Sequence, residues 1–537
     1  MTRTGDVLTR AHWAADRTEP VLDTTIGDVL RAAAGRAPDD LALVAGAPDP
    51  AARRQWSYAQ LLDAAEQAAL ALLGRFRPGE RVAVCAPNLP EWVVLEYAAA
   101  LAGLTLVTVN PANRAEELQH VLRHSSAAGV FVVDEWRGNP LAATVAGLRS
   151  ELPALRELIR FVDWEQFCGS GDDSWSLPSV GPEQPAQILY TSGTTGRPKG
   201  AVLNHRGLTN NARFAAAAVG CAPGEVWVSA MPLFHIAGCA MFTLGAAASG
   251  GALVLMPYFD PGLQLELIET YRGAIFGGVP TMLIALLAHT DLPRRDMSSV
   301  RYALAGGAPV PAELVRRVES TLGVPLVITF AQTEAHCSIT LTRLDDAPED
   351  RAETVGRPLP QNEVKIADLA TGEPAALGVI GEVCARGYLV MDGYLDDPEA
   401  TAAAVDADGW LHTGDLGSMD ERGHCRIEGR VKEMIIRGGE NIYPREIELV
   451  LFGHPRVADV AVFGVPDPEW GEQVAAVVRP AGDPPPTADE LTDFCRARLA
   501  GFKTPRRWAF VDAFPLTGSG KVRKHVLRER LVAGQLG

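Results

Sequence analysis

The sequence has few cysteines for its length, and they form no recognisable cluster. Eight cysteines are spread over 537 residues, with no C-x-x-C pair and no group of histidines beside them. A disulfide framework or a structural zinc site needs such clustering, so the pattern argues against both. It predicts reduced, mostly buried thiols in a cytoplasmic protein.

The chain also lacks an excess of positive charge. Its 66 acidic and 49 basic residues give a formal net charge of −17, and no basic patch stands out. Neither nucleic acid nor an anionic membrane surface is therefore an expected partner. A highly charged anionic substrate would need local hydrogen-bond donors and a metal ion, because the overall field of the protein repels it.

Long apolar segments are missing as well. The first twenty residues contain no apolar stretch of the kind that a signal peptide needs. Residues 236–259 carry no charge, but glycines interrupt them, and the break at 249–251 precedes a strand-like run from Ala252 to Met256. We predict a buried helix, a turn and a strand here, and no membrane span.

What the sequence does contain is a regular alternation of apolar runs and helical stretches. Its 47% of hydrophobic residues and 21% of charged residues are typical of a large globular protein. A helix is expected over residues 91–101, and strands are expected at 81–85, 104–109, 129–133, 274–276 and 301–304. This pattern predicts α/β layering with mostly parallel sheets.

The character of the sequence changes near residue 430. A helix is expected from Pro444 to Phe452, strands are expected at 457–465 and 473–478, and a T-x-x-E box at Thr487 and Glu490 starts another helix. This tail of about a hundred residues predicts a separate, small α+β domain.

Residues 190–200, YTSGTTGRPKG, concentrate hydroxyl groups, glycines and two cations between apolar segments. The run before them predicts a buried strand, and a helix is expected from about His205 to about Ala218. Backbone N–H groups, hydroxyls and a lysine in such a loop suit an anion. The phosphate-loop, dinucleotide and nucleophile-elbow patterns do not match. A flexible surface spacer is the alternative, which the specific Pro-Lys-Gly ending disfavours.

Four further motifs follow in order: FAQTE at 330–334, WLHTGD at 410–415, GRVK at 429–432 and PLTGSGK at 515–521. Each motif alone has an ordinary explanation as a turn or a solvated loop. Together with the loop at 190–200 they resemble the adenylate-forming superfamily, which includes acyl-CoA synthetases, firefly luciferases and the adenylation domains of peptide synthetases. The chain is most similar to AMP-forming acyl-CoA synthetases, over nearly its whole length.

The resemblance implies an α/β fold in two parts. A large N-terminal domain of stacked mixed and parallel sheets with helices would span residues 1–431, and a small mobile α+β domain would span 432–537, with the hinge at Lys432. The implied reaction has two steps. A carboxylate attacks the α-phosphate of ATP to give acyl-AMP and pyrophosphate, and coenzyme A then displaces AMP. ATP, Mg²⁺, coenzyme A and a carboxylic acid are thus the expected partners, and a homodimer is left open.

The same resemblance assigns roles to individual residues. The phosphates of ATP would be bound by Thr191, Ser192, Gly193, Thr194, Thr195 and Lys199. AMP would be bound by Gly307, Ala308, Pro309, Phe330, Ala331, Asp415 and Arg430. The catalytic residues would be Lys521, Glu334 and Thr333, with Glu334 as the Mg²⁺ ligand. The hinge and the coenzyme A tunnel would be formed by Lys432, Arg437, Gly438, Gly439 and Glu440.

The expected acyl pocket is apolar and has small residues in its wall. Its residues would be His235, Gly238, Cys239, Phe276, Val279 and Gly306. His235 stands where amino-acid adenylation domains carry an aspartate, which argues against an α-amino acid substrate. Small apolar walls leave room for a medium, long or bulky apolar acyl group. A structural histidine that caps the loop is the alternative for His235.

One position departs from the family pattern, because alanine replaces glycine at 331 in the motif that ends at Glu334. Its methyl group either reshapes the acyl pocket or weakens adenylation, which would leave a specialist that converts a supplied acyl-AMP to the thioester. A ligase that loads a separate carrier protein, a luciferase-type oxygenase and a non-catalytic nucleotide-binding relative are further alternatives. The presence of Lys521 and Glu334 argues against the last of these, and no carrier domain is seen after Lys521.

Overall fold

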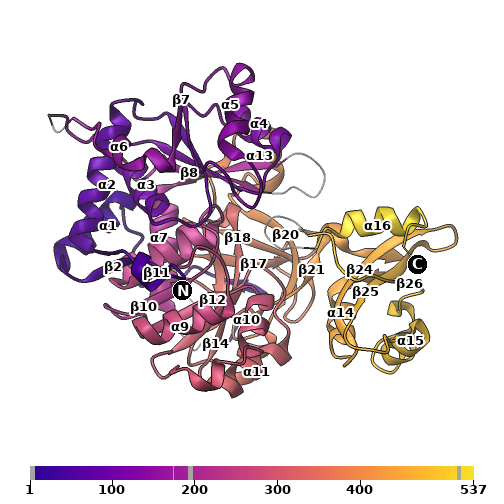
Figure 1. The fold of residues 1–537 in the computed structure, drawn as a ribbon. Coiled ribbons are helices and arrows are strands. Elements are labelled where there is room, and N and C mark those ends of the chain that lie inside the picture. Colours follow the sequence, from indigo (N-terminus) through magenta and orange to yellow (C-terminus); the bar gives the residue numbers. More distant parts are fainter. Residues whose placement is uncertain (1–6, 173, 192–197, 439, 517–521, 537) are drawn as a thin grey trace.

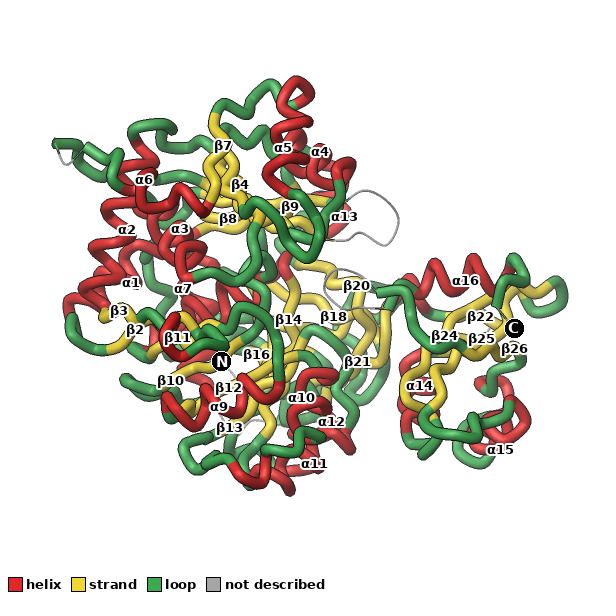
Figure 2. The backbone as a smooth tube through the Cα atoms, in the orientation of Figure 1, coloured by secondary structure: helices red, strands yellow, loops and turns green. Residues whose placement is uncertain are grey.

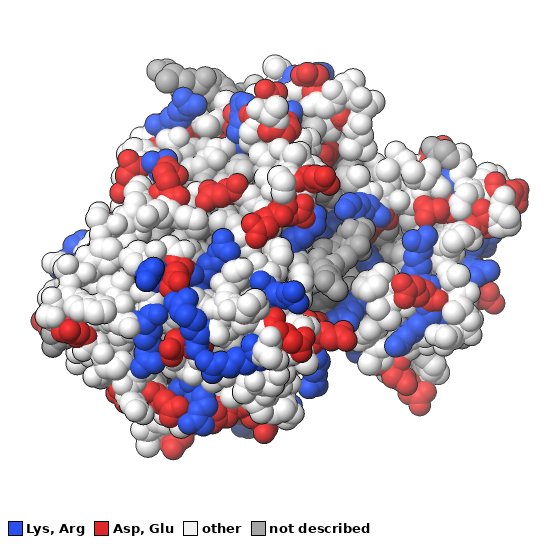
Figure 3. All heavy atoms as spheres, turned by 90° about the horizontal axis from the view of Figure 1, so that it is seen from above, with Lys and Arg blue, Asp and Glu red and all other residues white. Residues whose placement is uncertain are grey.

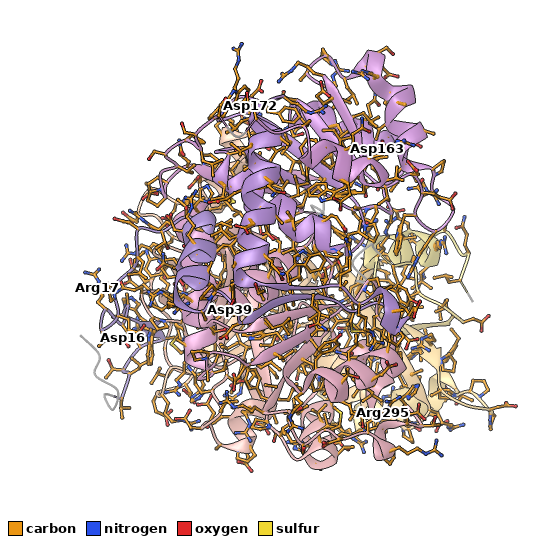
Figure 4. All side chains as sticks on the ribbon, turned by 60° about the vertical axis from the view of Figure 1, so that its left-hand side comes forward. Asp16, Arg17, Asp39, Asp163, Asp172 and Arg295 are labelled. Atoms are coloured by element: carbon orange, nitrogen blue, oxygen red, sulfur yellow. The ribbon has the colours of Figure 1, made fainter. Side chains whose placement is uncertain are left out.

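The computed structural model describes residues 7–172, 174–191, 198–438, 440–516 and 522–536. Three sheets belong to a large N-terminal part, and a fourth sheet forms a small C-terminal part at its side (Figure 1). Charged residues such as Arg17, Asp39 and Asp172 are exposed on the surface of the large part (Figure 4). Among the described residues, no helix is long and apolar enough to cross a membrane. The expected α/β fold class is confirmed.

The first sheet has seven strands in the order β19-β9-β8-β5-β4-β6-β7. Its strands are β4 (Arg81–Cys85), β5 (Thr105–Val109), β6 (Gly129–Val132), β7 (Glu157–Arg160), β8 (Pro185–Thr191), β9 (Lys199–Asn204) and β19 (Gly393–Tyr394). The strands from β8 to β7 in that order pair in parallel, whereas β9 is antiparallel to both β8 and β19. The loop at 190–200 therefore joins two antiparallel neighbours.

The second sheet has nine strands in the order β16-β15-β14-β13-β12-β10-β11-β2-β3. Its strands are β2 (Leu41–Ala45), β3 (Gln55–Ser57), β10 (Val226–Ser229), β11 (Ala252–Leu255), β12 (Gly273–Gly278), β13 (Tyr302–Gly306), β14 (Leu326–Gln332), β15 (Cys337–Leu341) and β16 (Arg357–Pro358). The strands from β2 to β14 pair in parallel, and the edges on both sides are antiparallel.

A layer of helices lies between these two sheets, because a single buried cluster contains side chains of both sheets and of the helices. These helices are α1 (Ile26–Arg36), α2 (Tyr58–Leu73), α3 (Pro90–Leu101), α7 (His205–Ala218), a π-helix (Ala237–Leu244) and α8 (Gly245–Ser249). The outer face of the first sheet packs against α4 (Ala115–His124) and α5 (Leu141–Leu148). The outer face of the second sheet packs against α9 (Pro261–Tyr271), α10 (Pro280–Leu287) and α11 (Ala312–Leu322).

The third sheet differs from the expectation of mostly parallel strands, because all its pairs are antiparallel. Its order is β1-β17-β18-β20-β21, with β1 (His12–Trp13), β17 (Glu363–Ala367), β18 (Gly381–Arg386), β20 (Leu411–Met419) and β21 (Cys425–Arg430). Hairpin connections such as the one between β20 and β21 are too short for a parallel crossover. The expectation of parallel strands therefore holds only within the first two sheets.

The small domain has a sheet in the order β23-β22-β25-β24, with β26 paired to β25. Its strands are β22 (Ile435–Arg437), β23 (Glu440–Ile442), β24 (Val457–Asp467), β25 (Gly471–Pro480) and β26 (Arg507–Phe510). The helices α14 (Pro444–Phe452) and α15 (Ala488–Arg496) pack on one face, and α16 (Lys524–Val532) packs on the other (Figure 2). The expected α+β composition of the tail is confirmed, including the Thr487 cap of α15.

Two local predictions are also confirmed. Asn204 caps α7 by accepting a hydrogen bond from the backbone N–H of Gly207, so the helix begins at His205 as expected. The uncharged stretch at 236–259 forms the π-helix, α8 and then β11, with Gly250 in the left-handed region at φ 72° as the break between helix and strand.

Candidate active site

The site is built at the ends of β8, β9, β14 and β20, where several of the expected motifs meet. Lys and Arg side chains gather on both sides of the hollow between the two domains (Figure 3). Thr191 at the end of β8 pairs in register with Lys199 at the start of β9. The structure therefore brings the two flanks of the expected phosphate loop together. Ser192, Gly193, Thr194 and Thr195 lie outside the described residues, and their roles stay predictions.

Lys199 and Glu334 come from distant parts of the chain and meet around Tyr394. The Nζ atom of Lys199 lies 5.1 Å from the centroid of the Tyr394 ring and 4.0 Å from Oδ2 of Asp397. The hydroxyl of Tyr394 donates to Oε1 of Glu334 at 2.8 Å. Burial, with the nearby Glu334 carboxylate, raises the pKa of Tyr394, so the hydroxyl stays a donor. Sequence reasoning missed Tyr394, whose only signal is a Gly-Tyr pair in a turn-rich stretch.

A buried histidine fixes the turn that carries Glu334. His336 follows the short helix Thr333–Ala335 with φ 50°, and its Nδ1 lies 2.7 Å from the carbonyl oxygen of Leu389. Its Nε2 accepts a hydrogen bond from the backbone N–H of Asn204 at 3.1 Å. Burial lowers the pKa of His336 to about 4, so the ring is neutral and Nδ1–H is the donor. The end of β9 and the Glu334 turn are thereby held together.

Phe330 and Ala331 lie on opposite faces of β14. Phe330 packs against the core beneath α9, α10 and α11, whereas Ala331 packs against the core that contains Cys239. The ladder between β14 and β15 is irregular between these two residues, and Ala331 pairs with Ser338. The residue that departs from the family pattern therefore lies on the same face of the sheet as Cys239, one of the residues expected to bind the acyl group.

Asp415 is held by two residues of the expected nucleotide site. Its side chain is 8% exposed, and its Oδ1 accepts a hydrogen bond from Nε of Arg430 at 3.0 Å. Gln332 donates through Nε2 to Oδ2 of Asp415 and, at 2.9 Å, to the carbonyl oxygen of Thr413. The FAQTE, WLHTGD and GRVK motifs thus meet at one carboxylate. The role of Gln332 was missed, although its position inside a motif was a signal.

The turn before Asp415 is fixed by Glu382. Its Oε1 accepts from the backbone N–H of Gly414 at 3.0 Å, and its Oε2 lies 2.8 Å from Nδ1 of His412. Gly414 has φ 68°, which a glycine adopts without steric cost. Glu382 was not predicted from the sequence, because a glutamate alternating along a strand is usually solvated.

The expected AMP loop and acyl pocket adjoin each other. Gly307 has φ 75°, and a methyl group on it would lie 3.8 Å from Cγ1 of Val279. Ala308 and Pro309 next to it are exposed. Gly306 lies against Thr329, whose Cγ2 would be 2.7 Å from an added Cβ.

The remaining acyl residues divide between two cores. Cys239 is fully buried, and its Sγ lies 3.4 Å from both Oε1 of Gln187 and the carbonyl oxygen of His235. Phe276 packs on the other face of the second sheet, with the core beneath α9 and α10. A Cβ at Gly238 would meet the Pro232 carbonyl oxygen at 2.2 Å. This glycine is thus required by backbone packing, whatever room it leaves for substrate.

In the small domain, the expected tunnel strand packs against Trp470. Gly438 has φ 59°, and an added Cβ would lie 2.6 Å from Cε3 of Trp470. The guanidinium of Arg437 lies 4.6 Å from the centroid of the same ring. Lys432 is in the turn Val431–Glu433 between the domains, and Glu440 is exposed. Gly439 and Lys521 lie outside the described residues, so their roles stay predictions, as does the exact domain boundary.

Comparison with known proteins agrees with this geometry. The sequence model of the AMP-binding enzyme family matches residues 30–395, and that of the AMP-binding enzyme C-terminal domain matches 446–521. The chain is 38% identical over 542 residues to the putative acyl-CoA synthetase YngI of Bacillus subtilis, covering 95% of this chain and 98% of that one. It is 35% identical over 543 residues to the human medium-chain acyl-CoA ligase ACSF2, covering 94% and 87%.

Solved structures show the same fold. ATP-bound MatB from Rhodopseudomonas palustris matches with a TM-score of 0.86 and 30% identity, over 94% of this chain and 99% of that one. These matches confirm the resemblance noted from the motifs. The chain belongs to the AMP-binding enzyme family and is an AMP-forming acyl-CoA synthetase, an acid–thiol ligase.

Proposed function

We propose that the enzyme activates an apolar, medium-chain or bulky carboxylic acid with ATP and passes the acyl group to free coenzyme A. The observation that carries this proposal is the meeting of Lys199 and Glu334 around Tyr394. Asp415 is held by Arg430 and by Gln332, which belongs to the same motif as Glu334. Lys199 would contact the phosphates, and Asp415 would accept from the ribose hydroxyls. Phe330 would stack on adenine against the loop 307–309.

Lys521 would supply positive charge where the carboxylate meets the α-phosphate. Preorganised charge at a developing anion is worth roughly 3–4 kcal/mol of barrier when one donor is removed. Thr333 would donate to the α-phosphate. After adenylation, rotation about Lys432 would bring Arg437, Gly438, Gly439 and Glu440 to the thiol path.

The residues present fit a magnesium ion. Mg²⁺ is usually bound by one or two carboxylates together with substrate phosphates. Glu334 offers one carboxylate, which the Tyr394 hydroxyl orients through Oε1, beside the lysine expected on the phosphates. Mg²⁺ would neutralise phosphate charge there, which matters in a protein with a net charge of −17.

An apolar acyl group is supported by the chemistry of the pocket residues. His235 stands at the position where binding of an α-amino acid would require an anionic side chain. Its Nδ1 accepts a hydrogen bond from the backbone N–H of Ala237 at 3.4 Å. Cys239, Val279 and Ala331 border the same apolar core. The relative ACSF2 is named a medium-chain ligase, which supports chains of that class.

The test measures both half-reactions of the purified enzyme with Mg²⁺ and a panel of acids. Straight-chain acids of increasing length, aromatic acids and α-amino acids are each assayed for ATP–pyrophosphate exchange and for acyl-CoA formation. Apolar acids should support both steps, and α-amino acids neither. Exchange with α-amino acids alone would overturn the apolar assignment. A lack of exchange with every acid, combined with turnover of supplied acyl-AMP, would establish the thioester specialist instead.

A further inference from the structure

A partly buried ionic contact joins three segments of the small domain, with the Glu433 side chain 37% exposed. Lys524 is the first residue of α16, and its Nζ lies 3.0 Å from Oε2 of Glu433 and 2.8 Å from Oε1 of Glu448. The Lys524 side chain is 24% exposed and that of Glu448 is 11% exposed. Burial lowers the pKa of Lys524, but the two carboxylates outweigh burial and raise it, so the ammonium stays charged.

The contact reaches across the sheet of the small domain. The helices α14, which carries Glu448, and α16 cover opposite faces of that sheet. Glu448 Oε1 also accepts from the backbone N–H of Val462 in β24 at 2.8 Å. Lys524 therefore links α16 to α14 and, through Glu448, to β24, which lies at the edge of the sheet. Its other bond, to Glu433, leads toward the connection between the domains.

Glu433 is the C-terminal end of that connection. On the other side, Arg430 is bound to Asp415 of the large domain at 3.0 Å. Only Val431 and Lys432 lie between the residue tied to the large domain and the residue tied to the small one. A change of φ and ψ between the domains is thus confined to two residues, one of them the expected hinge.

Lys524 also stands just after the segment that carries Lys521. The ends of this segment are joined by a β-bridge between Leu516 and Val522, and the backbone N–H of Arg523 donates to the carbonyl oxygen of Pro515 at 2.8 Å. Lys521 is three positions before Lys524 in the sequence. The base of the loop and the hinge are therefore linked by a single side chain.

We propose that Lys524 is a positioning residue for adenylation, because it binds the hinge residue Glu433 to the base of the Lys521 loop and makes them turn as one body. The inference rests on the proposed function, in which Lys521 acts only in the adenylation step. A misplacement of about 1 Å can cost about 10²-fold in rate, so a loose link would affect that step strongly.

The helix α16 also has an apolar anchor, so it should stay folded without this charge. Leu527 and Leu531 anchor the helix in the apolar core formed with β24 and β25. Lys503 provides a matched control, because its Nζ binds Glu446 of α14 at 2.6 Å and its side chain is 23% exposed. Among the described residues, that pair has no hydrogen bond or ion pair to residues 430–433 or to the described residues on either side of the Lys521 segment.

The experiment compares Lys524→Met, Glu433→Gln, Lys524→Arg and the control Lys503→Met in the full-length enzyme. Acid-dependent pyrophosphate release and thioester formation from supplied acyl-AMP are measured for each, together with amide hydrogen exchange over residues 431–437. Lys524→Met should slow adenylation about 10²-fold, with the rate of thioester formation close to that of the unmodified enzyme. Glu433→Gln should act in the same direction, Lys524→Arg should restore the rate, and Lys503→Met should change neither step.

Hydrogen exchange tests the link between Lys524 and the hinge independently of enzyme activity. The amide of Met434 donates to the carbonyl oxygen of Arg430 at 3.1 Å across the hinge, so it should exchange faster in Lys524→Met and not in Lys503→Met. If Lys524→Met changed neither hydrogen exchange at Met434 nor the adenylation rate, the proposal would be overturned. Equal losses of adenylation and thioester formation would also overturn it. If the unmodified enzyme adenylated no acid, the proposed function would fail. The hydrogen-exchange result would still show whether Lys524 holds the hinge.

Discussion

The two domains hold their functional residues in opposite ways. In the large domain, Asp415 is fixed by hydrogen bonds from two other motifs, and Glu334 by one from Tyr394. The neutral His336 holds the turn that follows Glu334. In the small domain, Gly438 lies against Trp470, which is itself 41% exposed. A nucleotide site gains from preorganisation, whereas a surface that must change partners between two steps needs freedom to move. The predictions below test this division.

The largest effect is expected from Lys521→Ala, because this lysine is the residue that we propose the small domain contributes to adenylation. Loss of its charge should raise the adenylation barrier by roughly 3–4 kcal/mol. Pyrophosphate release should be nearly abolished, while coenzyme A still consumes synthetic acyl-AMP. Equal loss in both half-reactions, measured with the same acid, would mean that the small domain does not change roles between the steps.

A large effect of the opposite sign is expected from Ala331→Gly in the large domain. If the methyl group displaces the acid from the α-phosphate by about 1 Å, its removal should speed adenylation by up to about 10²-fold. Coenzyme A attack on supplied acyl-AMP should barely change. Brisk adenylation that Ala331→Gly leaves unaltered would show that the substitution only tunes the pocket that Ala331 shares with Cys239.

At high pH the large domain, rather than the small one, should lose stability, because His424 loses its positive charge. Its side chain is 5% exposed, with Nε2 3.3 Å from Oδ1 of Asp346 and Nδ1 3.7 Å from Oδ2 of Asp420. Burial lowers the pKa of His424, but the hydrogen bond to Asp346 and the nearby Asp420 carboxylate outweigh burial and raise it to about 9.

Because the folded-state pKa is the higher one, the contribution of His424 is fully present below about pH 6.5 and is lost as the pH rises through about 9. The shift corresponds to about 3 kcal/mol in the free energy of unfolding. Calorimetry should show the large domain's transition falling over this range, and His424→Gln should flatten that dependence. A pH dependence that survives in His424→Gln would assign it to other groups.

The smallest effect is expected from Gly438→Ala. A left-handed conformation costs a non-glycine residue about 1–2 kcal/mol, and the new methyl group would press on Trp470. Thioester formation should fall several-fold, while acid-dependent ATP–pyrophosphate exchange stays close to that of the unmodified enzyme. Exchange that falls as far as thioester formation would show that this strand also serves the adenylation step.

Local signals in the sequence predicted much of the fold. The strand at 81–85, the helix from His205 and the helix from Pro444 to Phe452 form at the expected positions, because apolar periodicity and caps are properties of neighbouring residues. The antiparallel third sheet was missed, because pairing between strands is decided by contacts that are distant in sequence.

The same limit applies to the site. The motifs predict roles for Asp415, Glu334 and Lys199, because charged residue types at these positions suit nucleotide and metal binding. They did not identify Gln332, Tyr394 or Glu382, which act by holding another side chain across the fold. Such supporting residues become visible only when the strands that carry them are placed side by side.

The antiparallel pairing of β8 with β9 has a consequence for the electrostatics of phosphate binding. The helix that follows, α7, begins only at His205, at the far end of β9 from Lys199. The six residues of β9, at about 3.3 Å each, separate its N-terminus from the loop by about 20 Å. The helix dipole acts only within its first turn, so it cannot stabilise the phosphates. Nucleotide affinity here should depend on the donors of the loop itself, on side-chain cations and on magnesium, and hence on ionic strength.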